Sequence, residues 1–330
     1  MRIHCGIFYG GCAEWTLLRY FDKIQFMKIN ILLKGLFAAA LFATAGCDEG
    51  NKNPLSRERI GACSWSWRLP MKDVATVMDK AGIKGIQLAL GPFIEADGRH
   101  GEAESPETLK FVKEKIASGE WKLMNTMISF PQEDYTTLDT IRKTGGIVPD
   151  DSWERNRRMI TAAAKLTREL GAKYLLTHAG FLDEHDRQAY KKYVERISWV
   201  RDECKRYGVQ IMLETGQETA DDLVKFLTDV PGLAVNFDPA NMILYGKGEP
   251  LAALKKLFPW IVGVHIKDAK KTKVPGTWGE EVPWGTGEVG ADKFIAELEK
   301  LGYKGFYVVE REAGDNRAAD IALAAERLMK

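Results

Sequence analysis

The last third of the chain contains four short apolar runs, and each run ends at a polar residue. The runs end at Glu214, Asp238, His265 and Glu310, and they are rich in β-branched residues. Such runs are typical of strands that are buried on both faces. Segments with helical spacing separate them, so neighbouring strands are predicted to be parallel and joined by right-handed crossovers. We therefore expect the four polar side chains at the same end of adjacent strands.

The same alternation of apolar runs and helical segments extends back to residue 60. Strands are predicted over 60–68, 85–90, 121–129 and 172–180, and helices over 71–81, 106–118, 152–170 and 185–207. Further helices are expected from about Thr219, Glu249, Ala291 and Asn316. About eight strand–helix units over 60–330 fit a single-domain (β/α)8 TIM barrel. A long insertion at 130–151 follows the third strand and is a candidate lid.

The N-terminal segment has a different pattern. Residues 27–47 pass from basic residues through a short apolar stretch to small residues before Cys47, which is typical of a bacterial lipoprotein signal. A hydrophobic helix packed on the domain and a transmembrane anchor are the alternatives, but the stretch is shorter than the roughly 20 apolar residues that span a bilayer. We expect export, cleavage before Cys47 and lipidation of Cys47, with Thr44 standing where such signals usually have Leu.

This interpretation divides the chain into a leader and signal at 1–47, a polar tether at 48–59 and the barrel domain at 60–330. It places the protein in the periplasm or on the cell surface, in contact with the membrane only through its N-terminal lipid. Cys63 and Cys204 are the cysteines that follow Cys47, in a predicted strand and a predicted helix, so no disulfide framework is expected.

Composition adds few restrictions. With 330 residues, of which 45% are hydrophobic, the chain is able to bury a large core. Its net charge of +1 gives no general attraction for nucleic acid, which is not an expected partner.

The four strand-end residues are candidates for a metal site. In a closed barrel, Glu214, Asp238 and His265 would converge with Glu310 on the C-terminal mouth, where barrel enzymes carry their chemistry. An isolated polar residue at a strand end is the simpler explanation for any one of them, but four in successive units favour one shared site. Oxygen ligands with one imidazole suit Mn, Mg, Co or Zn.

Other residues are candidates for contact with a substrate. His178 ends the fourth predicted strand and is expected to face the mouth, although a hydrogen-bonded rim histidine is the alternative. Lys267 is either a cation that neutralises a charged intermediate or a solvated surface lysine. Tryptophans stack on sugar faces and also fill cores; the candidates here are Trp65, Trp67, Trp278 and Trp284. Asp268 is expected to cap a loop or to support His265.

Several motifs resemble those of the sugar phosphate isomerase/epimerase family, which shares the xylose isomerase-like TIM barrel of the AP endonuclease 2 superfamily. The motifs lie at 213–215, 237–241, 264–268, 285–287 and 302–305, the last followed by Glu310, and the resemblance covers 60–330. The resemblance implies that Glu214, Asp238, His265 and Glu310 hold one divalent ion. It also implies that Glu214 and Glu310 are catalytic and exchange a proton with the carbon next to a carbonyl.

The family includes epimerases, inosose dehydratases and repair nucleases of the endonuclease IV type. Asn241 stands where the epimerases usually have His, and an amide cannot carry a proton, so Asn241 is assigned to substrate binding. The nuclease is disfavoured because its multi-metal site needs more histidines.

We expect a metal-dependent isomerase or epimerase that acts on a keto sugar or related polyol, with a dehydratase, lyase or hydratase acting on a keto-glycoside or inosose as the alternative. A non-catalytic sugar-binding lipoprotein is the third hypothesis. Export favours an oligosaccharide or keto-glycoside over a sugar phosphate.

Overall fold

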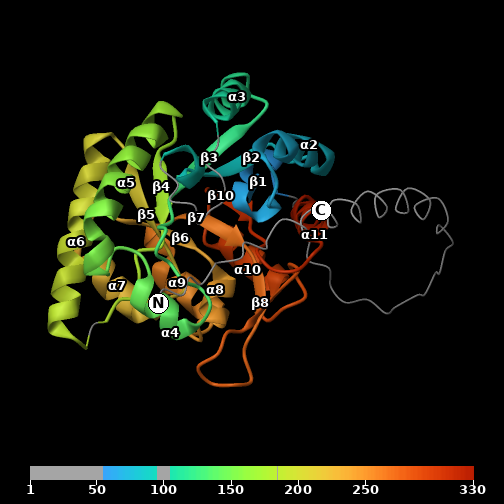
Figure 1. The fold of residues 1–330 in the computed structure, drawn as a ribbon. Coiled ribbons are helices and arrows are strands. Elements are labelled where there is room, and N and C mark those ends of the chain that lie inside the picture. Colours follow the sequence, from blue (N-terminus) through green and yellow to red (C-terminus); the bar gives the residue numbers. More distant parts are fainter. Residues whose placement is uncertain (1–54, 95–104, 184) are drawn as a thin grey trace, which may run out of the picture. The chain divides into compact units, whose positions relative to one another are not determined.

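The structure, a computed structural model, describes residues 55–94, 105–183 and 185–330. Eight parallel strands close a barrel in the order β1-β10-β7-β6-β5-β4-β3-β2. The strands lie near the centre of Figure 1. The strands are β1 (Ile60–Cys63), β2 (Gly85–Ala89), β3 (Lys122–Met127), β4 (Tyr174–Thr177), β5 (Gln210–Glu214), β6 (Ala234–Phe237), β7 (Ile261–Ile266) and β10 (Phe306–Val309). The predicted single-domain (β/α)8 barrel is confirmed.

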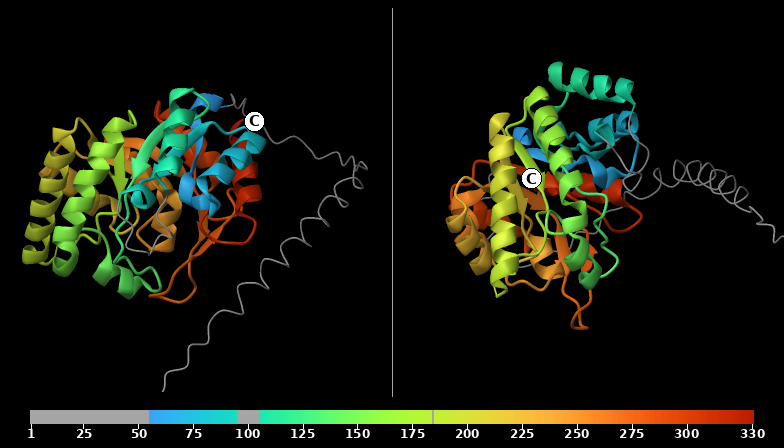
Figure 2. Two further views of the ribbon diagram at one scale, coloured as in Figure 1. Left: turned by 45° about the horizontal axis from the view of Figure 1, so that its top comes forward. Right: turned by 60° about the vertical axis from the view of Figure 1, so that its left-hand side comes forward.

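Helices surround the strands on the outside, as the two views in Figure 2 show. The main ones are α2 (Met71–Ala81), α3 (Pro106–Ala117), α5 (Asp150–Glu169), α6 (Arg187–Arg206), α7 (Ala220–Asp229), α9 (Pro250–Leu257), α10 (Ala291–Lys300) and α11 (Arg317–Leu328). Local sequence sets their ends. For example, the Ser105 side chain accepts a hydrogen bond from the Thr108 N–H at the start of α3, and Gly82 ends α2 in the left-handed conformation.

The alternation of side chains along each strand decides which residues reach the barrel interior. Leu213 on β5 and Val309 on β10 belong to the large apolar core that the strands share with the helices. Met212 and Val308 belong to two small separate clusters. Because successive side chains point to opposite faces, Glu214 at the end of β5 is expected on the same face as Met212, and Glu310, directly after β10, on the same face as Val308.

Two short helices and one hairpin of two strands were not predicted. A short helix, α8 (Pro239–Leu244), follows β6 directly, and α4 (Leu138–Thr144) lies within the insertion at 130–151. An antiparallel hairpin of β8 (Asp268–Lys270) and β9 (Glu280–Val282) follows β7. Its connecting loop projects from the barrel in Figure 1. The insertion contributes Tyr135 to the wall of a cavity described below, while its role as a lid stays a prediction.

The first strand is shorter than predicted. It ends at Cys63, and Ser64–Trp67 forms a 3-10 turn that ends at Arg68, whose φ of 50° is in the left-handed region. Leu55 and Arg59, from the end of the predicted tether, pack on the folded unit, where the Arg59 guanidinium donates hydrogen bonds to the carbonyl oxygens of Gly305 and Tyr303.

The predicted signal, Cys47 and residues 48–54 lie outside the described residues. Within the described ranges, no helix has the length and apolarity needed to cross a membrane.

Candidate metal centre and active site

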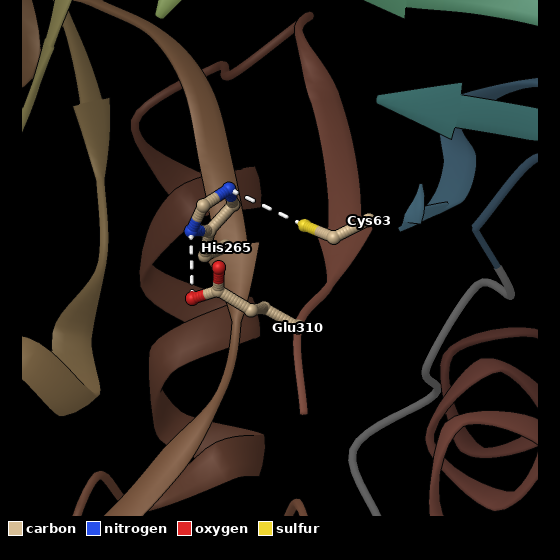
Figure 3. Close-up of side chains that lie close together, drawn as sticks. All are labelled: Cys63, His265 and Glu310. Carbon is tan, nitrogen blue, oxygen red and sulfur yellow. Dashed lines mark hydrogen bonds and ion pairs between the residues drawn. The ribbon is translucent and has the colours of Figure 1, made fainter. Parts of the chain in front are cut away.

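The four strand-end residues meet at the mouth of the barrel. His265 Nδ1 lies 2.9 Å from Glu214 Oε1, 3.3 Å from Glu310 Oε2 and 3.5 Å from Asp238 Oδ2. Figure 3 shows the contact between His265 and Glu310. One ligand atom from each of the four residues lies within 4.8 Å of the others, and all four side chains are buried. The structure therefore brings together the cluster that the strand ends predict.

Asp238 is held by the chain that follows it. Its Oδ1 accepts hydrogen bonds from the N–H groups of Ala240 (2.8 Å) and Asn241 (3.0 Å), so Asp238 caps the N-terminus of α8. Its own N–H donates to Thr215 Oγ1 at 2.8 Å. These bonds fix the carboxylate and leave Oδ2 facing His265.

The donor set fits a divalent cation. Asp238 Oδ2 and His265 Nδ1 are buried and make no well-directed hydrogen bond, so they are compensated only by the ion-pair contacts within the cluster. Three carboxylates and one imidazole nitrogen around one point form the kind of ligand set that Mn, Mg, Co or Zn accepts. Burial lowers the pKa of His265, but the charges of Glu214 and Glu310 outweigh burial and raise the pKa well above its ordinary value. The cluster therefore attracts a positive charge.

Two residues on the far side of the imidazole were missed from the sequence. Gln87 Oε1 lies 2.8 Å from His265 Nε2 and also accepts a hydrogen bond from Cys63 Sγ at 3.1 Å. Cys63 Sγ lies 3.8 Å from the same Nε2 (Figure 3). Gln87 is the polar residue within the otherwise apolar predicted strand 85–90, and this could have marked it as a candidate.

Cys63, His265 and Glu310 form a second group that is close enough to share an ion. The carboxylate set is the better site, for two reasons. Burial raises the pKa of the Cys63 thiol far above its ordinary value, which opposes the thiolate that binds metals. In addition, His265 Nε2 already faces Gln87.

The two glutamates have different surroundings. Glu310 accepts hydrogen bonds from Trp65 Nε1 (2.9 Å) and Lys267 Nζ (2.8 Å). Burial raises the pKa of Glu310, but Lys267 and His265 outweigh burial and hold the pKa well below its usual range. Glu214 has the amides of Asn236 (2.9 Å) and Asn241 (3.4 Å) as hydrogen-bond donors.

For Glu214, burial is the largest influence and raises the pKa to about 7. Glu310 therefore suits a permanently ionised ligand, whereas Glu214 is able to take up and release a proton near neutral pH.

Lys267 is a buried cation of the site and not a solvated surface lysine. Its Nζ lies 2.8 Å from Glu310 Oε2 and 2.7 Å from Glu312 Oε2, and the side chain is only 4% exposed. Burial lowers the pKa of Lys267, but Glu310 and Glu312 outweigh burial and raise it well above its ordinary value, so the ammonium stays charged.

A cavity of about 810 Å³ adjoins this cluster through Glu310, while Glu214, Asp238 and His265 lie outside its lining. Its lining includes five of the residues proposed from the sequence, namely Trp65, His178, Asn241, Lys267 and Glu310. Burial lowers the pKa of His178 to about 4, so its imidazole is neutral at physiological pH. Trp278, another of the tryptophans considered, also lines the cavity, together with Phe93, Tyr135 and Tyr245, which were missed.

Two predicted substrate contacts are placed in the core instead. Trp67 is 4% exposed and belongs to the apolar core, because the 3-10 turn after β1 directs Trp65 and Trp67 differently. Trp284 is also buried, with its ring centroid 6.3 Å from that of Phe294. Neither residue lines the cavity, so their positions do not support stacking on a sugar.

Asp268 caps the loop that follows the hairpin. Its carboxylate accepts hydrogen bonds from the N–H groups of Gly285 (2.9 Å), Gly287 (2.9 Å) and Val289 (3.1 Å). A Cβ on Gly287 would lie 2.2 Å from Asp268 Oδ1, so only glycine fits there. Of the two roles expected for Asp268, the structure shows loop capping.

Comparison with known proteins identifies the family. The profile described as "Xylose isomerase-like TIM barrel" matches residues 76–330. The chain belongs to this family.

The putative L-ribulose-5-phosphate 3-epimerase SgbU of Escherichia coli K12 is 26% identical over 168 residues, which cover 48% of this chain and 58% of that protein. An inosose dehydratase of Bacillus cereus is 31% identical over 112 residues, covering 30% of this chain and 37% of that protein. The chain thus spans only about a third to a little over half of these curated relatives.

Solved structures agree with the fold. A xylose isomerase domain protein from Planctomyces limnophilus is 29% identical, with a TM-score of 0.68, and the match covers 77% of this chain and 89% of that one. A xylose isomerase-like TIM barrel protein from Mycobacterium smegmatis, solved in complex with magnesium, is 18% identical with a TM-score of 0.60 and covers 82% and 95% of the two chains.

Proposed function

We propose that the protein is a metal-dependent isomerase or epimerase that removes a proton next to the carbonyl of a keto sugar or related polyol. The observation that carries this proposal is geometric: Glu214 and Glu310 lie on one buried cluster with Asp238 and His265, a set able to hold a divalent cation. The magnesium complex of the fold relative and the epimerase and dehydratase names of the sequence relatives are consistent with it.

The residues divide the chemistry among them. A divalent ion held by Glu214, Asp238, His265 and Glu310 would polarise a substrate carbonyl. Glu214, a carboxylate held by the amides of Asn236 and Asn241, takes the proton from carbon and returns it.

Residues of the cavity wall act on the substrate's oxygens. The Lys267 ammonium, 2.8 Å from Glu310, stabilises negative charge as it develops on a substrate oxygen. The neutral imidazole of His178 and the amide of Asn241, which both line the cavity, hydrogen-bond substrate hydroxyl groups.

A dehydratase or lyase acting on a keto-glycoside or inosose is the second candidate, and Asn241 is the observation that favours it. Epimerisation needs a proton carrier on each face of the carbon. Glu310, whose pKa Lys267 and His265 hold well below its usual range, is a poor proton donor for the second face, and the amide of Asn241 cannot replace it. Elimination instead needs only one carbon-directed base together with a positive charge near the leaving oxygen, and the buried Lys267 ammonium, which stays charged, lines the cavity. The presence of both glutamates argues against a non-catalytic sugar-binding role.

The N-terminal assignment remains part of this proposal. An exported chain anchored through a lipid on Cys47 would meet carbohydrates in the periplasm or at the cell surface. Metabolic labelling with a fatty acid is expected to mark the full chain and to fail with Cys47→Ser. Equal labelling of both would contradict the anchor.

Metal content and solvent-proton exchange test the function. The purified protein is expected to hold about one divalent ion per chain, and it should exchange a carbon-bound proton of a keto sugar with deuterium from solvent. His265→Ala should lose the ion, and Glu310→Gln should lose exchange. His185→Ala, at an exposed position, is the matched control.

Product mass separates the two chemistries, because isomerisation conserves mass and elimination loses water or an aglycone. A protein that binds sugars but neither holds an ion nor exchanges protons would refute the catalytic proposal.

A further inference from the structure

The two ends of the barrel differ in charge, although the net charge of the chain is only +1. In the described segments that follow the strands, at the mouth, acidic residues outnumber basic ones. The segments that precede the strands form the opposite end, which we call the base: 55–59, 82–84, 118–121, 170–173, 207–209, 230–233, 258–260 and 301–305. Basic residues predominate there, with Arg57, Arg59, Lys84, Lys173 and Lys304 against Glu58 and Glu120.

The basic residues of the base form a continuous arc. Lys304 precedes β10, Arg57 precedes β1, Lys84 precedes β2 and Lys173 precedes β4. The strands β10, β1, β2, β3 and β4 are neighbours in this order around the barrel. Lys122, the first residue of β3, lies between Lys84 and Lys173 in the arc. One half of the base is therefore positively charged.

Four cations of this arc are exposed, and within the part of the chain that the structure describes none of them forms an ion pair: Arg57, Lys84, Lys173 and Lys304. Arg59 and Lys122 differ, because each has a carboxylate oxygen at 3.3 Å, from Glu299 and from Glu58. The four exposed cations are thus available to an anionic partner.

The other half of the base is uncharged and partly aromatic. The segments 207–209, 230–233 and 258–260, which precede β5, β6 and β7, contain no Asp, Glu, Lys or Arg. They carry the half-buried rings of Tyr207, Phe258 and Trp260 beside the exposed Pro231 and Pro259. Cations next to such rings are typical of surfaces that rest on a bilayer, where aromatic rings lie at the level of the headgroups and Lys and Arg contact anionic lipids.

The chain enters the domain at this end. The Leu55 N–H donates a hydrogen bond to the Leu328 carbonyl oxygen at 3.2 Å, and Leu55 precedes β1, in the middle of the basic arc. Cys47 stands eight positions earlier, and such a stretch of chain spans at most about 30 Å. The 20 residues of α5 cover about the same length. A lipid on Cys47 would therefore hold the base nearer to a bilayer than the mouth.

We propose that the base of the barrel docks on a bilayer surface that carries anionic headgroups, with the basic arc on the headgroups and the uncharged half at the interface. The mouth then faces away from the bilayer, and its excess of negative charge opposes the reverse orientation. This inference goes beyond the proposed function, because the metal cluster needs neither a docking face nor an orientation. It rests on that function only where the lipid on Cys47 is used to orient the barrel.

Vesicle binding tests the docking face. The full chain with Cys47→Ser, which is unable to carry the lipid, is mixed with vesicles of phosphatidylcholine alone or of phosphatidylcholine and phosphatidylglycerol in equal amounts. Co-sedimentation measures the bound fraction. We expect tighter binding to the vesicles that contain phosphatidylglycerol, and we expect added salt to weaken it because ions screen exposed charges.

Paired variants locate the contact. Lys84→Gln with Lys304→Gln removes two cations of the arc and should weaken binding to the anionic vesicles about 25-fold, since each cation near the surface contributes about fivefold. Lys271→Gln with Lys273→Gln removes two exposed lysines at the mouth end and is the matched control, which should bind like the Cys47→Ser chain. Both pairs keep the apolar stretch before Cys47, so its own affinity for lipid cancels in the comparison.

Hydrogen exchange tests the orientation. On anionic vesicles, the backbone amides of 82–84 and 301–305 in the full chain should exchange several-fold more slowly than in its absence from vesicles, whereas those of 271–279 at the mouth end should be unchanged. Slower exchange at 271–279 in place of the two base segments would overturn the proposed orientation.

The outcomes separate this inference from the proposed function. Equal binding to the two kinds of vesicle, or equal losses in the two paired variants, would overturn the docking face and leave the metal content and proton exchange of the proposed function untouched. Binding to duplex DNA that is as tight and as sensitive to Lys84 and Lys304 would assign the arc to nucleic acid and overturn the bilayer. Lower stability without weaker binding would restrict both lysines to supporting helix C-termini, with the same consequence. Selective vesicle binding by a chain that takes up no fatty acid would support docking and refute only the anchor.

Discussion

Gln87 Oε1 lies 2.8 Å from His265 Nε2, on the side of the imidazole opposite to the carboxylates of the cluster. A hydrogen bond from Nε2–H to this oxygen leaves Nδ1 as the nitrogen with a free lone pair, which is the form that binds a metal. The contact joins β2 to β7 across the barrel.

Gln87→Met, which keeps the length and removes the acceptor, is therefore expected to weaken metal affinity about 10- to 100-fold. Competition with a fluorescent chelator measures the change. Cys63→Ala, in the same buried group, should have a much smaller effect, because its sulfur lies 3.8 Å from the ring nitrogen. Equal losses in the two variants would mean that packing, and not the hydrogen bond, supports His265.

Asp238→Asn separates the structural role of Asp238 from its role as a ligand. The amide oxygen is able to keep the bonds to the N–H groups of Ala240 and Asn241, so α8 should remain capped, but the charge near His265 is lost. Added Mn at 100 times its Kd should stabilise the original protein by about 2.7 kcal/mol and should stabilise the variant far less. Thermal unfolding with and without the ion tests this. Asp222→Asn, at the start of α7, is the control, and the same gain in Asp238→Asn would exclude Asp238 as a ligand.

Arg311 is held between two carboxylates, with 2.7 Å to Glu281 and 2.9 Å to Asp320, and its side chain is 8% exposed. Arg311→Met would remove the cation paired with Glu281 and Asp320, whose side chains are 8% and 16% exposed, and should cost up to about 3–5 kcal/mol in the free energy of unfolding. Arg327→Met removes a 3.2 Å pair with Asp292 at the surface and should cost less than about 1 kcal/mol. Urea unfolding of both variants provides the comparison, and similar costs would argue against a buried anchor.

Glu218, in the segment after β5, gives a pH-dependent prediction. Burial raises the pKa of this carboxyl to about 8, above its ordinary value of 4.5. A carboxyl whose pKa is raised by folding favours the folded state fully below its unfolded pKa, and this contribution is lost as pH rises through the folded pKa.

The free energy of unfolding should therefore fall from about pH 5 to pH 8 by up to a few kcal/mol on account of Glu218. Glu218→Gln should flatten this fall and should be more stable than the original protein at pH 9. Chemical unfolding across this range tests it, with Glu154→Gln at the surface as the control. A parallel pH curve in Glu218→Gln would show that this carboxyl does not titrate there.

The sequence predicts the fold and the four-residue cluster for one physical reason. The carboxyl ends of parallel strands meet at one end of a barrel, so strand-end residues such as Glu214 and Glu310 are brought together by topology alone. Gln87 is different, because it faces His265 only after the barrel closes, and the two residues are 178 positions apart in the chain.

The pattern of apolar residues in the sequence also does not show which tryptophans lie at the site and which lie in the core. Trp65 donates a hydrogen bond to Glu310, whereas Trp67, two residues later, is in the core. A 3-10 turn at Ser64–Trp67 decides this, and an apolar run that looks like one continuous strand does not reveal the turn. The lipoprotein signal and Cys47 stay predictions, because they lie outside the described residues.

The β8–β9 hairpin is fastened at both of its ends, by Asp268 to the loop at 285–289 and by Glu281 to Arg311. The loop at 271–279 between them carries Trp278 but none of the four cluster residues. This stretch is therefore exchangeable: a loop of different length or chemistry, grafted between the same two anchors, would alter which molecules enter the barrel mouth and leave the ligands of the ion untouched.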